Sequence, residues 1–159
     1  MTKSNSMPIE DEYVWYVAYG PEMSKAIILE YFKDYKGPEF DVDESMLVYL
    51  DRNISFSKSK STGKIVPFLA LEESKTRTYA RAYKMSFDQF QHIRRKLDYY
   101  NINVTFDHCL GYIPIALTSE RDLSKTKPSF EDVQDMIIGL QELDISDTEI
   151  KKYISKIMK

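Results

Sequence analysis

The stretch from Tyr13 to Met23 constrains the fold of this chain more than any other segment. Residues 13–19 are seven consecutive apolar or aromatic residues, two of them β-branched, which is typical of a strand buried on both faces. Gly20 follows, and its lack of a Cβ permits a sharp backbone turn. Pro21 and Glu22 suit the first positions of a helix, because proline has a preset φ and an acid faces the positive helix end. We therefore predict a strand that turns directly into a helix.

Such a turn is a common place for a ligand, because backbone N–H groups converge there. The residues alone leave two interpretations open: the turn is only a connection, or it also holds a small molecule. We therefore treat Tyr19, Gly20, Pro21, Glu22 and Met23 as candidate substrate-binding residues.

Length and charge narrow the function classes. The 159 residues predict a single domain with its own core. A net charge of −3 provides no overall field for nucleic acid or an anionic membrane. No apolar run approaches the roughly 20 residues of a membrane-spanning helix. We expect a soluble protein with neither nucleic acid nor membrane as partner, and the sequence leaves the oligomeric state open.

Residue types that bind metals are scarce. Cys109 is the only cysteine, so no internal disulfide can form, which fits the reducing cytoplasm. Besides it, only His92 and His108 offer ligands typical of zinc, so we expect no metal and no cofactor. Residues 1–11 are polar and lack the apolar core of a signal peptide. We expect a disordered tail there and a cytoplasmic location.

Hydrophobic periodicity and turn residues predict the order of elements. We expect a helix at 21–35, a buried strand at 46–50, a hairpin at 54–60 and 65–71, a strand at 77–85, a helix from 86 to about 98, a strand at 109–118, and a helical hairpin over 129–158 packed on the sheet. Pro67 indicates an edge position or a bulge in the hairpin. Ser86 with Gln89, and Ser146 with Glu149, have the spacing of capping boxes. The mixture predicts the α+β class.

The predicted strand at 77–85 has an unusual alternation. One face carries the large residues Arg77, Tyr79, Arg81, Tyr83 and Met85, and the other carries small ones at 78, 80 and 82. We expect the small face to lie under a helix. The large face is either a surface ladder or the wall of a cavity. In a cavity, Arg81 would be the best candidate for holding an anion, with Tyr83 beside it.

Tyr16-Val17-Ala18-Tyr19-Gly20 resembles the Tyr-Phe-Ala-Tyr-Gly-Ser-Asn signature of the gamma-glutamyl cyclotransferase-like superfamily. Here Pro21-Glu22 replaces the Ser-Asn of that signature. Residues 83–86 are similar to the family segment that leads into the helix bearing the catalytic acid, and the trailing helices resemble small bacterial members. The resemblance implies a small mixed β-barrel with flanking helices and a cavity at one end.

The resemblance also implies what the reaction requires. A Glu near the end of the helix after Ser86 moves protons in active members, and here that position falls near Leu97, with Asp98 one residue on. One residue on a helix rotates a side chain by about 100°. Pro21 removes a backbone donor, and Glu22 places a negative charge where the substrate carboxylate would lie. Asp98 and Glu22 are therefore the candidate catalytic residues.

Three functional hypotheses follow. The first is a cyclotransferase-like fold without standard cyclotransferase activity, which binds a small molecule or a partner in the former substrate cavity. The second is a divergent enzyme acting on a gamma-glutamyl or amine-bearing substrate, with Glu22 recognising a cation. The third is an interaction protein that presents the large face of residues 77–83 or its C-terminal helices. A Glu22 carboxylate directed into an enclosed cavity favours the second hypothesis, and one on the outer helix surface removes its main support.

Overall fold

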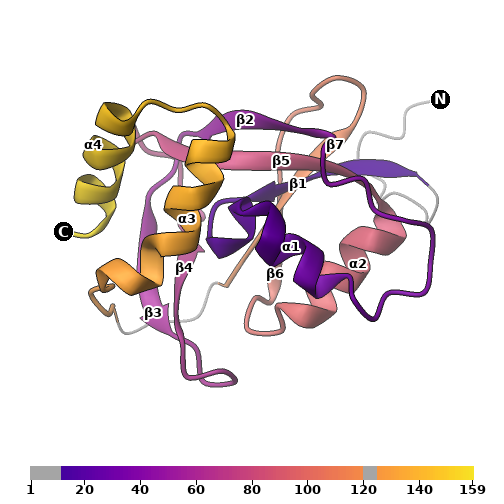
Figure 1. Ribbon diagram of the computed structural model, residues 1–159, viewed down its shortest axis with the longest axis horizontal. Coiled ribbons are helices and arrows are strands. Elements are labelled where there is room, and N and C mark those ends of the chain that lie inside the picture. Colours follow the sequence, from indigo (N-terminus) through magenta and orange to yellow (C-terminus); the bar gives the residue numbers. More distant parts are fainter. Residues whose placement is uncertain (1–11, 120–124) are drawn as a thin grey trace.

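The computed structural model describes residues 12–119 and 125–159, so the tail expected at residues 1–11 lies outside the described part. The elements follow in the order β1 (Tyr13–Ala18), the 3₁₀ helix η1 (Pro21–Met23), α1 (Lys25–Tyr31), β2 (Ser45–Leu50), β3 (Ile54–Lys58), β4 (Ile65–Leu69), β5 (Thr78–Ser86), α2 (Phe87–Lys96), β6 (Ile102–Thr105), β7 (Ile113–Thr118), α3 (Phe130–Glu142) and α4 (Asp147–Ile157) (Figure 1).

Strand β1 is the middle strand of a five-stranded mixed sheet with the order β2-β5-β1-β7-β6. It pairs antiparallel with β5 and parallel with β7. Because both of its edges are paired and both of its faces are covered, every residue after Tyr13 in the strand is buried. The predicted buried strand at the start of the chain is confirmed.

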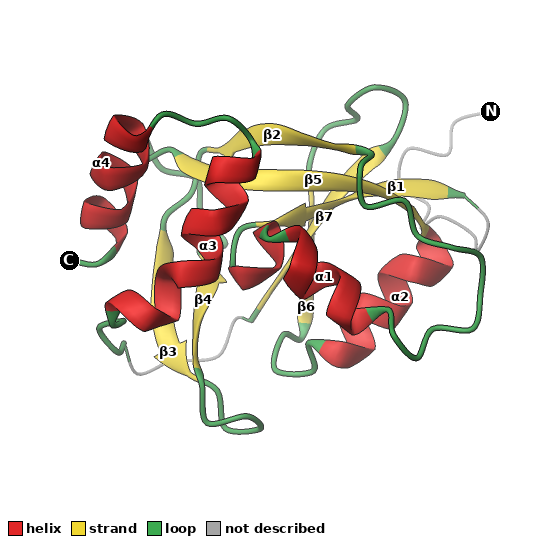
Figure 2. Ribbon diagram, viewed as in Figure 1, coloured by secondary structure: helices red, strands yellow, loops and turns green. Residues whose placement is uncertain are grey.

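Helices α1, α2 and α3 lie against one face of this sheet (Figure 2). Side chains of β1 alternate between the faces, so Tyr16 points to the helices and its ring centroid lies 6.1 Å from that of Phe90 in α2. The C-terminal α4 reaches the end of β5, where the rings of Tyr79 and Tyr153 stack at 4.7 Å. The predicted pair of C-terminal helices is present as α3 and α4.

Strands β3 and β4 form a separate two-stranded sheet. The Thr118 hydroxyl at the end of β7 ties this hairpin to the main sheet: it accepts a hydrogen bond from Leu69 N at 2.9 Å and donates one to Leu69 O at 2.7 Å. The α+β class with flanking helices is confirmed. Among the described strands the two sheets do not close into a barrel.

Several predicted boundaries were wrong for local reasons. The helix expected at 21–35 is broken at Ser24, whose extended backbone separates η1 from α1, and α1 ends at Tyr31. The strand expected from Cys109 begins only at Ile113, because residues 109–112 form a tight turn. The strand β6 was not predicted from the sequence. The strand β2 is an edge strand and largely half-buried, not fully buried.

The predicted caps were largely correct. Ser86 and Gln89 form the complete reciprocal capping box of α2, with Gln89 N donating to Ser86 Oγ at 3.1 Å and Ser86 N donating to Gln89 Oε1 at 2.8 Å. At α4, the Ser146 hydroxyl accepts a hydrogen bond from Glu149 N, which is half of the predicted box. No helix within residues 12–119 and 125–159 combines the length and apolar character needed to cross a membrane.

Candidate functional site

The turn after β1 is tightly built. Its backbone closes with a hydrogen bond from Met23 N to Gly20 O at 3.0 Å. Gly20 has φ −116° and ψ −152°, so an unusual φ does not explain the glycine, contrary to the sequence-based argument. A Cβ at this position would lie 2.9 Å from Pro67 Cγ and 3.2 Å from Glu22 Oε1. Close approach of the β3–β4 hairpin is therefore what favours glycine here.

The Glu22 side chain points into the protein and is only 3% exposed. Its Oε1 accepts a hydrogen bond from Gly20 N at 3.0 Å, so the carboxylate folds back onto its own turn. Burial raises the pKa of Glu22 from its ordinary value of 4.5 to about 7, although the hydrogen bond from Gly20 opposes that rise. Glu22 thus occupies the backbone donor that the turn would offer to an external anion.

Tyrosine side chains surround this carboxylate. Burial raises the pKa of each, and the Glu22 charge raises it further; the group comprises Tyr16, Tyr19, Tyr31, Tyr83, Tyr99 and Tyr100. These phenols are therefore neutral at pH 7, so each hydroxyl keeps a proton that it can donate.

Three of these tyrosines donate hydrogen bonds to backbone carbonyls of the segments around the turn. The Tyr83 hydroxyl lies 2.9 Å from both Glu22 O and Met23 O and donates to this pair of carbonyls. Tyr19 donates to Leu117 O at 2.5 Å. Tyr100 donates to Pro67 O at 2.5 Å. The turn, the hairpin and the end of β7 are therefore joined through tyrosine hydroxyls.

Arg81 lies beneath the turn, with its side chain 3% exposed. Its Nη1 donates to Met23 O at 2.9 Å and to Glu142 Oε1 at 2.7 Å, and its Nε donates to Ser45 Oγ at 2.9 Å. The guanidinium is thus matched by a carboxylate from α3. Since Arg81 and Tyr83 are both buried, the large face of β5 is not the surface ladder considered from the sequence.

The small face of β5 also differs from its prediction. Ala82 faces away from the helices and pairs with Val17 of β1 and Met46 of β2. The helices cover the large side chains of β5, and the expected helix over the small face is wrong. The physical reason is that the buried carbonyl of Met23 in η1 requires hydrogen-bond donors. The long side chains of Arg81 and Tyr83 reach it from β5 on the face that the helices cover.

The two candidate positions near the end of α2 differ in solvent exposure. Leu97, the C-cap residue directly after α2, is buried, whereas Asp98 is exposed and accepts a hydrogen bond from Ser61 Oγ at 3.3 Å. The end of α2 reaches the turn through Tyr100, whose ring centroid lies 6.3 Å from that of Tyr19. The structure therefore gathers the candidates from Tyr19 to Met23 with Arg81 and Tyr83, and leaves Asp98 on the surface.

Sequence reasoning did not single out Tyr31, Tyr99 and Tyr100 at this site. The available signal was the pair of aromatic residues directly after the predicted end of the helix, in a chain with 12 tyrosines. Two cavities, of about 230 and 480 Å³, lie elsewhere, and neither Gly20 nor Glu22 lines them. Among the residues that the structure describes, no group of three or more His, Cys, Asp or Glu side chains is placed to hold a metal.

Comparison with known proteins bears on the fold. No protein-family model matches the sequence, and no curated protein matches it. Among solved structures, a gamma-glutamyl cyclotransferase superposes with a TM-score of 0.66 at 15% identity, covering 93% of this chain and 89% of the other. The chain has a gamma-glutamyl cyclotransferase-like fold.

Two further structures share this cyclotransferase-like fold. An uncharacterized protein from Homo sapiens superposes with a TM-score of 0.64 at 13% identity, over 93% of this chain and 89% of its own. YkqA from Bacillus subtilis gives 0.64 at 13% identity over 92% of this chain. The chain spans only 54% of YkqA. At these identities the likeness concerns the fold alone.

Proposed function

We propose that this cyclotransferase-like protein lacks standard cyclotransferase activity and binds a small molecule at the turn formed by residues 19–23, in the cytoplasm. The observation that carries the proposal is the hydrogen bond from Gly20 N to Glu22 Oε1. An anionic substrate group would have to displace this internal carboxylate and would meet its charge. A neutral or cationic ligand would meet no such obstacle.

The end of α2 supports the same conclusion. Intramolecular attack by a γ-glutamyl amine requires one group that accepts a proton and returns it to the leaving amine. Leu97 has no ionisable group, and Asp98 points to the hairpin surface. The acid that the family resemblance implies is therefore not supplied from this helix.

A divergent enzyme remains a second candidate, favoured by the burial of Glu22. With a pKa of about 7, the carboxyl is present in both protonation states at neutral pH. Such a group can accept a proton and return it, and its charged form would pair with an ammonium group. The substrate would then carry an amine where the standard substrate carries a carboxylate.

One assay separates these functions. The protein is incubated with a γ-glutamyl dipeptide and with a γ-glutamyl amine, and release of 5-oxoproline is measured for wild type, Glu22→Gln and Asp98→Asn. We expect no release from the dipeptide. Turnover of the dipeptide that Asp98→Asn abolishes would contradict the first proposal.

The Asp98→Asn variant also serves as the matched control for Glu22→Gln, because each replaces one carboxylate by its amide, buried at Glu22 and exposed at Asp98. The second candidate would be established if wild type and Asp98→Asn release 5-oxoproline from the γ-glutamyl amine and Glu22→Gln does not. The binding function would be supported by two results together. Neither substrate would release 5-oxoproline, and calorimetry would show that wild type binds the γ-glutamyl amine whereas Glu22→Gln does not.

A further inference from the structure

The face of the sheet opposite the helices contains an apolar cavity of about 230 Å³. Neighbouring strands contribute one layer of it: Val17 pairs with Ala82, Met46 pairs with Ala82, and Trp15 pairs with Pro114. Because paired residues lie on the same face of a sheet, these side chains form a continuous floor. The cavity is therefore separated by the sheet from the turn that holds Glu22.

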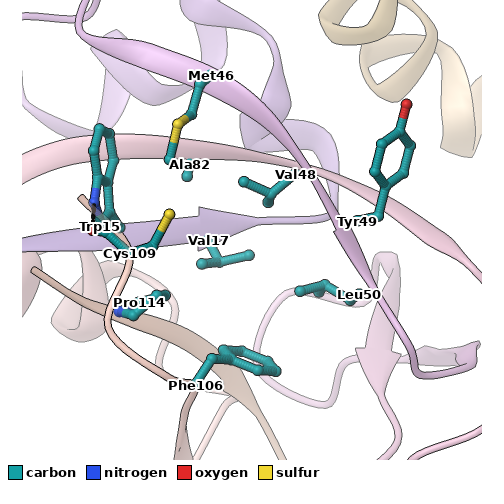
Figure 3. Close-up of a pocket in the computed structure, with 10 residues that line it drawn as sticks. All are labelled: Trp15, Val17, Met46, Val48, Tyr49, Leu50, Ala82, Phe106, Cys109 and Pro114. Carbon is teal, nitrogen blue, oxygen red and sulfur yellow. Dashed lines mark hydrogen bonds between the residues drawn. The ribbon is translucent and has the colours of Figure 1, made fainter.

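The connection between β6 and β7 forms the opposite wall. Phe106 and Cys109 from this connection line the cavity, and the Trp15 indole donates a hydrogen bond to Cys109 O at 2.8 Å, which fixes the connection over the floor. Figure 3 shows the ten lining residues, with the Cys109 sulfur directed toward the middle of the group. The segment is thus built across the sheet without filling the space beneath it.

The lining provides few charged or hydrogen-bonding groups for a polar ligand. None of the ten residues is charged, and the indole N–H is already donated to Cys109 O. Among the nearby cations, Arg52 donates to Ala70 O at 3.2 Å and Lys84 pairs with Glu44 at 3.5 Å. The Arg77 guanidinium lies 4.5 Å from the centroid of the Tyr49 ring. A charged or strongly hydrated molecule would lose its water here without compensation.

We propose that this cavity is a second binding site, for an uncharged apolar molecule about the size of a single aromatic ring. Its volume supports that size, since an enclosed apolar cavity of about 150 Å³ in another protein binds benzene, and the space here is larger and open to solvent at the rim, where Tyr49 is 45% exposed. Its lining of Trp15, Phe106 and Met46 offers aromatic edges and a polarizable thioether, which pack well against an aromatic ring.

Two unique residues report directly on occupancy. Trp15 is the only tryptophan of the chain and Cys109 the only cysteine, and both line the cavity. Toluene is titrated into the full chain while tryptophan fluorescence is recorded, and the rate of Cys109 alkylation by iodoacetamide is measured in parallel. We expect a saturable change in fluorescence and, at saturation, alkylation slowed by about tenfold.

Variants assign the signal to the cavity. Ala82→Phe fills the floor and should weaken toluene binding by about tenfold or more, which corresponds to about 1.4 kcal/mol. Ala26→Phe makes the same change on the exposed side of α1 and should leave binding unchanged. If Ala82→Phe does not fold, Val48→Phe replaces it, because Val48 is half-buried on the edge strand β2 and tolerates a larger side chain more readily.

Three results would overturn the proposal. The first is an absence of saturable change in wild type up to the solubility of toluene. The second is equal binding by wild type and the filled variants. The third is a concentration-dependent dimer, seen by sizing, that protects Cys109 without any ligand, since the cavity would then be covered by a second copy of the chain.

Discussion

Replacing Glu22 by Gln should change how the stability of the protein depends on pH. The Glu22 carboxyl has an ordinary pKa of 4.5, and burial raises it to about 7 in the folded protein. Between these values the folded protein binds a proton that the unfolded chain has released. The free energy of unfolding therefore falls as the pH rises from about 4.5 to 7, and stays low above that range.

The expected size follows from the two pKa values. Their difference, at about 1.36 kcal/mol for each pH unit, corresponds to about 3 kcal/mol. Because Gln keeps an oxygen for Gly20 N but cannot ionise, wild type should lose about 3 kcal/mol relative to Glu22→Gln between pH 4.5 and pH 8. Any fixed cost of the Gln side chain is the same at both pH values and cancels.

Urea denaturation of both proteins at pH 4.5, 6, 7 and 8, followed by circular dichroism, provides the measurement. All other ionisable groups are the same in both proteins and cancel in the comparison. The matched control is Asp98→Asn, which removes an exposed carboxylate and should follow wild type at every pH. A change of less than about 1 kcal/mol between the extremes, or a change of opposite sign, would refute the burial of the Glu22 carboxylate and its raised pKa.

Three further predictions concern the same region. The double variant Pro21→Ser, Glu22→Asn frees Gly20 N and removes a negative charge from the turn. Calorimetry should therefore show that it binds α-amino acids more tightly than wild type by about 1.5–3 kcal/mol, without turnover. No gain in binding would mean that the turn does not bind anions. Gly139→Ala raises helix propensity, yet should destabilise the protein by about 1–3 kcal/mol in urea, because the new Cβ would lie 2.5 Å from Met23 Cβ. A stabilised variant would contradict this close packing of α3 on η1. Glu142→Ala should lower the free energy of unfolding by about 1.5–3 kcal/mol, since it removes the carboxylate 2.7 Å from a buried guanidinium, and an effect equal to that of an exposed Glu131→Ala would contradict it.

The elements that the sequence specifies locally were predicted well. The run from Tyr13 to Ala18 has few alternatives to a central strand, because seven apolar residues must be covered on both faces. The box of Ser86 and Gln89 fixes the start of α2 through contacts four residues apart or fewer. The turn between the two predicted hairpin strands contains Gly63, whose left-handed φ of 72° glycine adopts without a steric cost.

The missed helix break depends on contacts between distant segments. The break at Ser24 is stabilised by Met23 O accepting hydrogen bonds from Arg81 and Tyr83, about 60 positions later in the chain. Helical periodicity cannot reveal such partners, so the expected helix ran through the break. The short strand β6 is different: residues 102–105 alternate apolar and polar side chains, so a local strand signal was present, and the prediction overlooked it.

The position of Glu22 was the least predictable and the most informative part of the site. At the start of a helix an acid normally faces solvent and stabilises the helix end by a few tenths to 1 kcal/mol. Here the side chain turns inward, where its burial costs about 3 kcal/mol at neutral pH. A glutamine would accept the same hydrogen bond from Gly20 N without that cost. Stability alone therefore does not account for the carboxylate, and this agrees with the proposal that the turn is a binding site for a small molecule.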